Sequence, residues 1–177
     1  MSKTYFKPAR LTALLALCAV SAVSSLAMAE PLNVQAVMVP KEQIRLDFKD
    51  GSGHFVLMVR REGTAAGTGL LHDAAISEFG RHDIVPGVSG DPSGYLVATK
   101  GEGNLAYIKW TVRAIFLPGE DGKPEINDNG FWEVVGGTGT FKGLKGAGSL
   151  HIKSVSPTDR LFKLEGEMVL PPQPSRP

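Results

Sequence analysis

The amino-acid sequence predicts an all-β domain, and three of its features support this. Apolar and polar residues alternate with a period of two through most of the chain, whereas helical periodicity is almost absent. Clusters of glycine, proline, asparagine and aspartate indicate turns at 50–51, 87–94, 101–103, 118–123 and 128–130. About eight antiparallel strands in one domain favour a closed barrel or a sandwich, and only closure removes the exposed strand edges.

The first predicted strand covers residues 43–48 and stops at the Asp50–Gly51 turn. Its apolar residues alternate with polar ones and predict a half-buried strand; the apolar ones are Ile44, Leu46 and Phe48. The next strand, residues 54–61, is apolar on both faces, so we expect it to be covered on both sides or to line a cavity. Other short strands are expected at 74–79, 94–99, 131–135, 148–155 and 160–170.

The longest predicted strand is NLAYIKWTVRAIFL, residues 104–117. Every even position from Ala106 to Phe116 is apolar, while the odd positions include Tyr107 and Arg113. One face of this strand therefore belongs to the core, and the other faces solvent or a polar-lined cavity.

The first 29 residues are interpreted as a cleaved signal peptide. Three basic residues precede an apolar run, residues 11–22, that is too short to span a bilayer comfortably, and Ala27-Met28-Ala29 provides a cleavage site. We therefore expect a periplasmic or secreted protein whose mature chain begins at Glu30. It contains one barrel domain, residues 30–170, and a disordered proline-rich tail, residues 171–177.

Cleavage changes the composition of the protein. It removes the only cysteine, Cys18, so the mature domain has no disulfide; a lipoprotein would need a small residue where Leu17 stands. It also removes three of the 19 basic residues and none of the 18 acidic ones, which leaves 16 against 18 and a net charge of −2. This balance argues against nucleic acid as a partner, and no second apolar segment predicts stable membrane insertion.

Residues 133–153, EVVGGTGTFKGLKGAGSLHIK, hold six of the 21 glycines. A dinucleotide-binding fingerprint would need glycine at position 142, where Lys142 stands, and no helix follows to receive a phosphate. The glycines are instead interpreted as a corner at which the sheet changes direction, because glycine permits positive φ and sharp bends. Phe141 is expected to close the barrel end, with Lys142 and Lys145 in solvent.

The corner segment Gly136-Gly137-Thr138-Gly139-x-Phe141-x-x-x-Lys145-Gly146 resembles a segment of plant dirigent proteins, allene oxide cyclases and their bacterial barrel-like relatives. The resemblance implies an all-β fold, an eight-stranded antiparallel closed barrel of calycin-like arrangement with a largely apolar cavity. It also implies cofactor-free activity: cyclisation of a reactive epoxide, or guided coupling and ring closure of phenolic intermediates. The corner residues Gly136, Gly137, Gly139, Phe141 and Gly146 are expected to have a structural role.

Residues 70–91 contain two His-Asp pairs, at 72–73 and 82–83. Adjacent residues on a strand point to opposite faces, so at most one member of each pair can face inward, and no metal site is expected. A histidine or carboxylate facing an apolar cavity has its pKa shifted by desolvation and suits acid–base catalysis. The alternative is a strand-end cluster that satisfies loop backbone. The catalytic candidates are His72, Glu78, His82 and Asp83.

Four side chains are candidates for ligand binding: Tyr95, Tyr107, Trp110 and Arg113. The aromatic rings either stack on a flat ligand or fill the core of a small barrel. Tyr107 and Arg113 share the polar face of the long strand. They would orient a carboxylate or phenol if that face looks inward, and they are surface residues if it looks outward.

We expect, from these features together, a protein that binds a small hydrophobic or aromatic molecule in its barrel without a cofactor. One alternative is a cofactor-independent isomerase, cyclase or lyase that uses an acid–base histidine or carboxylate. Another is a structural envelope protein with a filled barrel, and a homo-oligomer is left open. An interior packed solid by Trp110, Phe116, Phe162 and Met168 would exclude both binding and catalysis.

Overall fold

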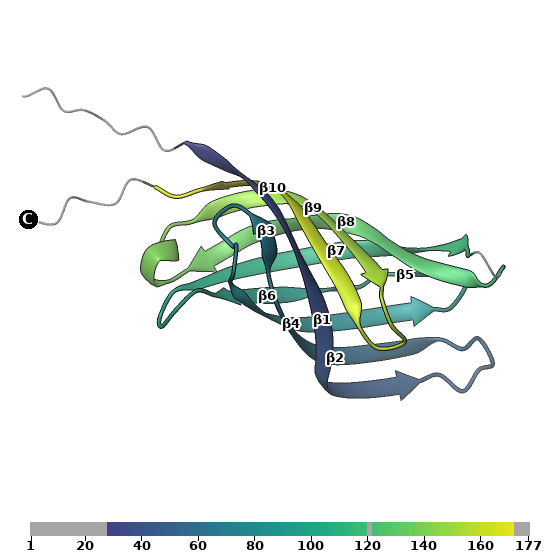
Figure 1. Ribbon diagram of the computed structural model, residues 1–177. Helices are drawn as coiled ribbons and strands as arrows, with labels where there is room; N and C mark the ends of the chain where they lie inside the picture. Colours follow the sequence, from purple (N-terminus) through teal and green to yellow (C-terminus); the bar gives the residue numbers. More distant parts are fainter. Residues whose placement is uncertain (1–27, 120–121, 172–177) are drawn as a thin grey trace, which may run out of the picture.

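The computed structural model describes residues 28–119 and 122–171 (Figure 1). Most of the predicted signal peptide, residues 1–27, and most of the predicted tail, residues 172–177, lie outside the described residues. No helix in the described ranges is long and apolar enough to cross a membrane.

The strands form one antiparallel sheet that closes on itself. In order around the ring, its members are β1 (Ala29–Asp47), β2 (Phe55–Thr64), β4 (Ala75–Val85), β6 (Ser93–Thr99), β7 (Leu105–Pro118), β8 (Pro124–Gly137), β9 (Lys145–Ser154) and β10 (Arg160–Val169). Pairing of β10 with β1 completes the ring. Two short strands, β3 (Ala66–Thr68) and β5 (Ser89–Gly90), add to β1 and to β4 and β7. The predicted eight-stranded antiparallel closed barrel is confirmed.

The barrel interior is filled by side chains that alternate along each strand. On β7 the even-numbered residues from Ala106 to Ala114 are buried, as the sequence predicts. The same alternation places residues of β1, β4, β9 and β10 inside, and the largest fully buried side chains include Met38, Leu96, Trp110, Leu150, Trp132 and Phe162.

A β-bulge in β1 changes which of its residues face inward. Pro40 pairs with Arg61 and Glu42 pairs with Arg60, so Lys41 is an extra residue on this strand. Even-numbered residues face the core before the bulge, whereas Ile44 and Leu46 face outward after it and are 76% and 60% exposed. The prediction of a half-buried strand at 43–48 is therefore wrong.

The predicted turn at 128–130 is also wrong, because these residues lie inside β8. Gly130 packs against β7 so closely that a Cβ on it would lie 2.0 Å from the Thr111 carbonyl oxygen. Asp128 faces the barrel interior and is 4% exposed. Residue types that usually mark a turn are here explained by close strand packing and by a polar interior.

The glycine-rich corner connects β8 to β9 at one end of the barrel. It contains a single 3-10 turn, Gly139–Phe141, and Phe141 is 3% exposed within the core. Gly139 has φ +55°, and a Cβ on it would lie 2.2 Å from Asn104 Oδ1, so only glycine fits. Lys142 and Lys145 are exposed. The corner interpretation of this segment is confirmed.

Candidate functional site

Three charged or titratable side chains from β2 and β4 meet inside the barrel. Arg61 and Glu78 occupy directly opposite positions, and Arg61 Nη1 donates to Glu78 Oε2 at 2.8 Å. His82 Nε2 lies 3.2 Å from Glu78 Oε1 and 3.1 Å from Arg61 Nη1. This nitrogen either donates to the carboxylate or accepts from the guanidinium, so its tautomer decides which contact forms.

The residue between Glu78 and His82 on this face of β4 is Gly80, and it makes the cluster possible. A Cβ at Gly80 would lie 2.3 Å from Glu78 Oε1 and 2.9 Å from His82 Nε2. The absence of a side chain therefore lets the carboxylate and the imidazole approach one another along a single strand face.

Asp128 on β8 adds a second carboxyl group to the interior. Burial raises its pKa to about 6, an effect that the positive charges of Arg160 and Arg61 partly oppose. Burial also lowers the pKa of Arg160, whose Nη1 donates to the Asp159 carbonyl at 2.9 Å. A carboxyl group with this pKa exchanges its proton close to neutral pH.

Four buried side-chain atoms in the described part of the chain have no hydrogen-bond partner. They are Arg61 Nε, Trp110 Nε1, Trp132 Nε1 and Asp128 Oδ1. Trp110 and Trp132 are opposite one another in the β7–β8 register, and Trp110 also contacts His82, with 5.9 Å between ring centroids. Leaving a buried polar group unpaired costs roughly 1–3 kcal/mol of stability. A ligand or a water molecule that bonds to these four atoms would therefore be bound favourably.

A pocket of about 530 Å³, whose lining is mainly apolar but includes Glu125, Asn127, Lys153 and Ser154, opens at the end of the barrel near this cluster. Its lining includes Ile84 on β4 and Ile126 on β8, together with Phe55 and Phe116. The next inward-facing residue is His82 on β4 and Asp128 on β8, because same-face residues are two apart. The pocket therefore lies next to the buried charges along both strands, and none of Arg61, Glu78, His82 and Asp128 is part of its lining.

The other half of the barrel is filled. Its remaining void, lined by residues that include Met38, Ile108 and Phe162, measures about 10 Å³, which is room for one water at most. Trp110, Phe162 and Met168 are fully buried, whereas Phe116 lines the open pocket instead of filling the core. Of the four side chains whose packing would exclude a ligand, three are thus buried in the core and one, Phe116, lines a pocket.

The four catalytic candidates separate into two pairs. Glu78 and His82 lie together in the interior, whereas His72 and Asp83 lie outside it. His72 belongs to the turn before β4 and contacts Asp73, with 3.1 Å between Nε2 and Oδ2. His82 and Asp83 point to opposite faces, as expected of neighbours on a strand.

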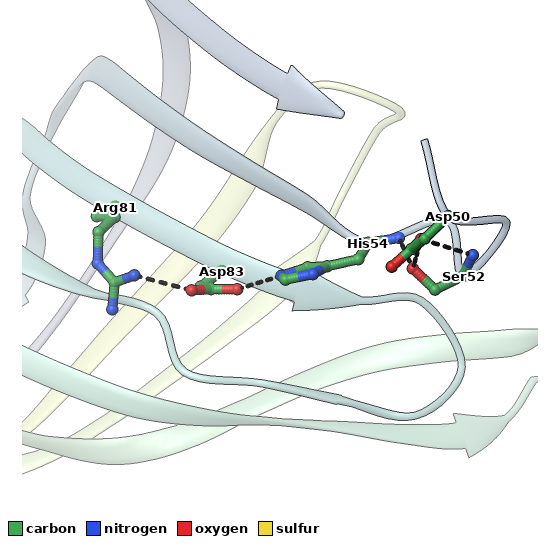
Figure 2. A network of polar contacts seen from close by, with 5 residues as sticks. All are labelled: Asp50, Ser52, His54, Arg81 and Asp83. Atoms are coloured by element: carbon green, nitrogen blue, oxygen red, sulfur yellow. Dashed lines mark hydrogen bonds and ion pairs between the residues drawn. The ribbon is translucent and has the colours of Figure 1, made fainter. Parts of the chain in front are cut away.

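Asp83 belongs to a network on the outer surface (Figure 2). Its Oδ1 lies 2.6 Å from His54 Nε2, and Arg81 Nη1 donates to its Oδ2 at 3.0 Å. The hydrogen bond with His54 is the main reason that the pKa of Asp83 is lowered. The Ser52 hydroxyl donates to Asp50 at 2.6 Å and accepts the His54 backbone N–H, so it holds the turn and not the imidazole ring.

The four ligand-binding candidates also separate. Trp110 lies in the interior, whereas Tyr95, Tyr107 and Arg113 face outward, and Arg113 pairs with Asp91. The long strand's polar face is thus its surface face, and Tyr107 and Arg113 do not orient a ligand in the barrel.

A hollow of about 800 Å³ lies over the outer face of the sheet, where Tyr95 is joined by Met58, Phe79 and Phe131. It is larger than the pocket at the barrel end, and Arg61, Glu78, His82 and Asp128 are absent from the lining of both. The two differ because Ile84 and Ile126, which line the barrel-end pocket, are the next inward-facing neighbours of His82 and Asp128. We therefore place the candidate site at the barrel end. No group of three or more metal-ligating side chains suited to a metal ion occurs within the described ranges.

Several residues of the cluster were not predicted as site residues: Arg61, Asp128, Arg160 and Trp132. Arg61 carries a usable signal, since it shares the apolar face of Val59 in a strand expected to be covered on both sides. Asp128 was missed because it was assigned to a turn at residues 128–130. Nothing in the sequence distinguishes Arg160 from a surface residue or Trp132 from a core residue.

Comparisons with known proteins show similarity of fold alone. No family model and no curated protein sequence matches the chain. The structure of the pterocarpan synthase dirigent protein GePTS1 is 13% identical over 94% of this chain and 98% of its own, with a TM-score of 0.50. That of the pterocarpan synthase dirigent protein PsPTS1 is 14% identical over 82% and 97%, with a TM-score of 0.51. A β-barrel-like protein from Acinetobacter baumannii AYE is 11% identical over 80% and 96%, with a TM-score of 0.48. The chain has a barrel fold of the dirigent and allene oxide cyclase type.

Proposed function

We propose that the protein binds a small hydrophobic or aromatic molecule at the open end of its barrel, with a polar group of the molecule directed at the buried cluster. One observation carries the proposal: the pocket of about 530 Å³ is lined by Ile84 and Ile126, the next inward-facing neighbours of His82 and Asp128, and the interior beyond them holds buried polar atoms that lack partners. Ligand pockets commonly have roughly this volume and combine an apolar lining with a few convergent polar groups.

The unpaired atoms indicate the kind of polar group that the ligand carries. Three of them are N–H donors, on Arg61, Trp110 and Trp132, and one is a carboxyl oxygen, on Asp128. A carbonyl, phenolic or carboxylate oxygen accepts from such donors, so the ligand we expect has an apolar body and an oxygen-bearing end.

One substitution inside the pocket and a matched one outside it test the proposal. We expect native mass spectrometry of protein from its own cell envelope to detect a small molecule on the wild type. Ile126→Trp, which fills the pocket from β8, should lose this molecule, whereas Ile115→Trp on the outer face of β7 should keep it. Absence of any bound molecule, or equal binding by both variants, would contradict the proposal and favour a structural envelope protein.

Catalysis is the second candidate function, and the Glu78–His82 pair favours it. An imidazole beside a carboxylate, together with Asp128 whose pKa is about 6, offers acid–base groups for a cofactor-independent isomerase, cyclase or lyase. Two structures with this fold are named as pterocarpan synthases, which supports a barrel of this type housing a reaction. His82→Gln should then abolish turnover of the bound molecule while the molecule still binds. Unchanged turnover would contradict a catalytic role of His82 and leave binding as the only proposed function.

A further inference from the structure

The second half of β1 has a free strand edge. β10 pairs with β1 only from Ala29 to Met38, and residues 39–47 pair with β2 on their other edge. No strand in the described part of the chain covers the remaining edge of this segment, which runs along the lower border of the molecule in Figure 1. Unpaired backbone groups on such an edge are a template for another strand.

The direction of the backbone groups follows from one hydrogen bond. The Phe48 N–H donates to the His54 carbonyl, at 2.9 Å, and therefore points toward β2. Backbone groups alternate along a strand in an antiparallel pair, so those of Ile44 and Leu46 also point toward β2. The N–H and C=O groups of Gln43, Arg45 and Asp47 consequently point to the free edge.

The side chains of this segment are exposed on both faces of the hairpin. Ile44, Leu46 and Phe48 form an apolar row on the outer face. Arg45 and Asp47 lie on the opposite face, where Arg45 Nε donates to Asp47 Oδ1 at 2.8 Å. The segment thus reads apolar, positive, apolar, negative, apolar from residue 44 to residue 48.

We propose that this edge binds a second copy of the chain, in antiparallel register about a twofold axis at Leu46. Arg45 then faces the partner's Asp47, and Ile44 faces the partner's Phe48. Opposite charges and apolar pairs at directly opposed positions stabilise strand pairing. A twofold contact of this kind also consumes the free edge, so assembly stops at the dimer.

Charge complementarity selects this register among its neighbours. An axis at Arg45 would set the two arginines directly opposite one another, which is repulsive. An axis at Ile44 would set Leu46 opposite the partner's Glu42, so an apolar side chain would face a charge. Only the axis at Leu46 combines two opposite-charge pairs with three apolar pairs.

Charge reversal and its compensation test the contact and its register together. In sedimentation velocity over a range of concentrations, the wild type should form a dimer. Arg45→Asp and Asp47→Arg should each raise the dimer dissociation constant by at least about tenfold, because each places like charges opposite one another twice. The double variant R45D/D47R should restore the wild-type constant. Arg113→Asp, which removes another exposed arginine from an exposed ion pair, is the matched control and should leave dimerisation unchanged.

Hydrogen exchange provides a second readout that does not depend on the variants. Amides of Arg45 and Asp47 should exchange more slowly at concentrations where the dimer forms, and those of Ile44 and Leu46 should change little. A monomer at every concentration up to millimolar overturns the proposal. So does a dimer that withstands both single reversals and instead dissociates on Phe131→Glu, because that result places the contact at the outer hollow.

Discussion

His82 and Asp83 show at the scale of single residues how strand alternation assigns chemistry. The first faces the interior beside Glu78, and the second faces solvent beside His54 and Arg81. Both are acid–base groups by type, yet only the inner one lies beside the open pocket. The same alternation places Arg61 within hydrogen-bond reach of Glu78, and a buried charge needs such a partner.

Asp128 makes stability depend on pH in a direction opposite to that of most carboxylates. Its pKa rises from 3.8 in the unfolded chain to about 6 in the folded one, so between these values the folded state holds a proton that the unfolded state has lost. The free energy of unfolding therefore falls as pH rises from about 4 to about 6. For a shift of this size, the loss is roughly 3 kcal/mol.

Asp128→Asn should remove this dependence. The difference in the free energy of unfolding, wild type minus variant, is measured by urea unfolding at several pH values. We expect this difference to fall as pH rises from about 4 to about 6. Asp83→Asn is the control with the opposite sign: the pKa of Asp83 is lowered, so its contribution is present above about 4 and is lost as pH decreases. A difference for Asp128→Asn that is flat or rises with pH would contradict the assignment.

At the scale of strands, two elements depart from the sequence-based expectation for physical reasons. The extra residue Lys41 in β1 exchanges the inward-facing and outward-facing positions of the strand. The sequence does not indicate this bulge, because apolar and polar residues alternate in the same phase before and after it. In β8, Asp128 and Gly130 are residue types typical of a turn. The Asp128 carboxyl group instead points into the barrel interior, and Gly130 allows β7 to approach closely. Strands with uninterrupted alternation, such as β7, were predicted correctly.

Gly130 provides a test of the close approach between β7 and β8. Gly130→Ala should destabilise the protein by about 1–3 kcal/mol, since the added Cβ would lie 2.0 Å from the Thr111 carbonyl oxygen and the strands must separate. Gly136→Ala on the same strand is the matched control, because its Cβ would lie 3.7 Å from Tyr107 Cδ2, an ordinary contact. Equal stability of the two variants in urea unfolding would contradict this account of β8.

At the scale of the whole molecule, the closed barrel was predictable because alternation, turns and the glycine corner all indicate it. Two residues of the candidate cluster, Glu78 and His82, were also named from the sequence. Asp128 and Arg160 were not named from the sequence. Their roles depend on closure of the ring, which brings residues of β8 and β10 near the buried charges of β2 and β4. Local sequence patterns do not report which distant strands face one another across a barrel.

The central claim is that a small molecule enters the open end and reaches the buried cluster, and the two tryptophans report on it directly. Trp110 and Trp132 are the only tryptophans of the chain, and both have buried indole N–H groups without partners. Titration with 2-naphthoate, followed by heteronuclear NMR, should shift at least one indole N–H signal, and Ile126→Trp should weaken the effect. Indole signals that stay unmoved while residues around Tyr95 and Phe131 shift would place the ligand on the outer face and contradict the claim.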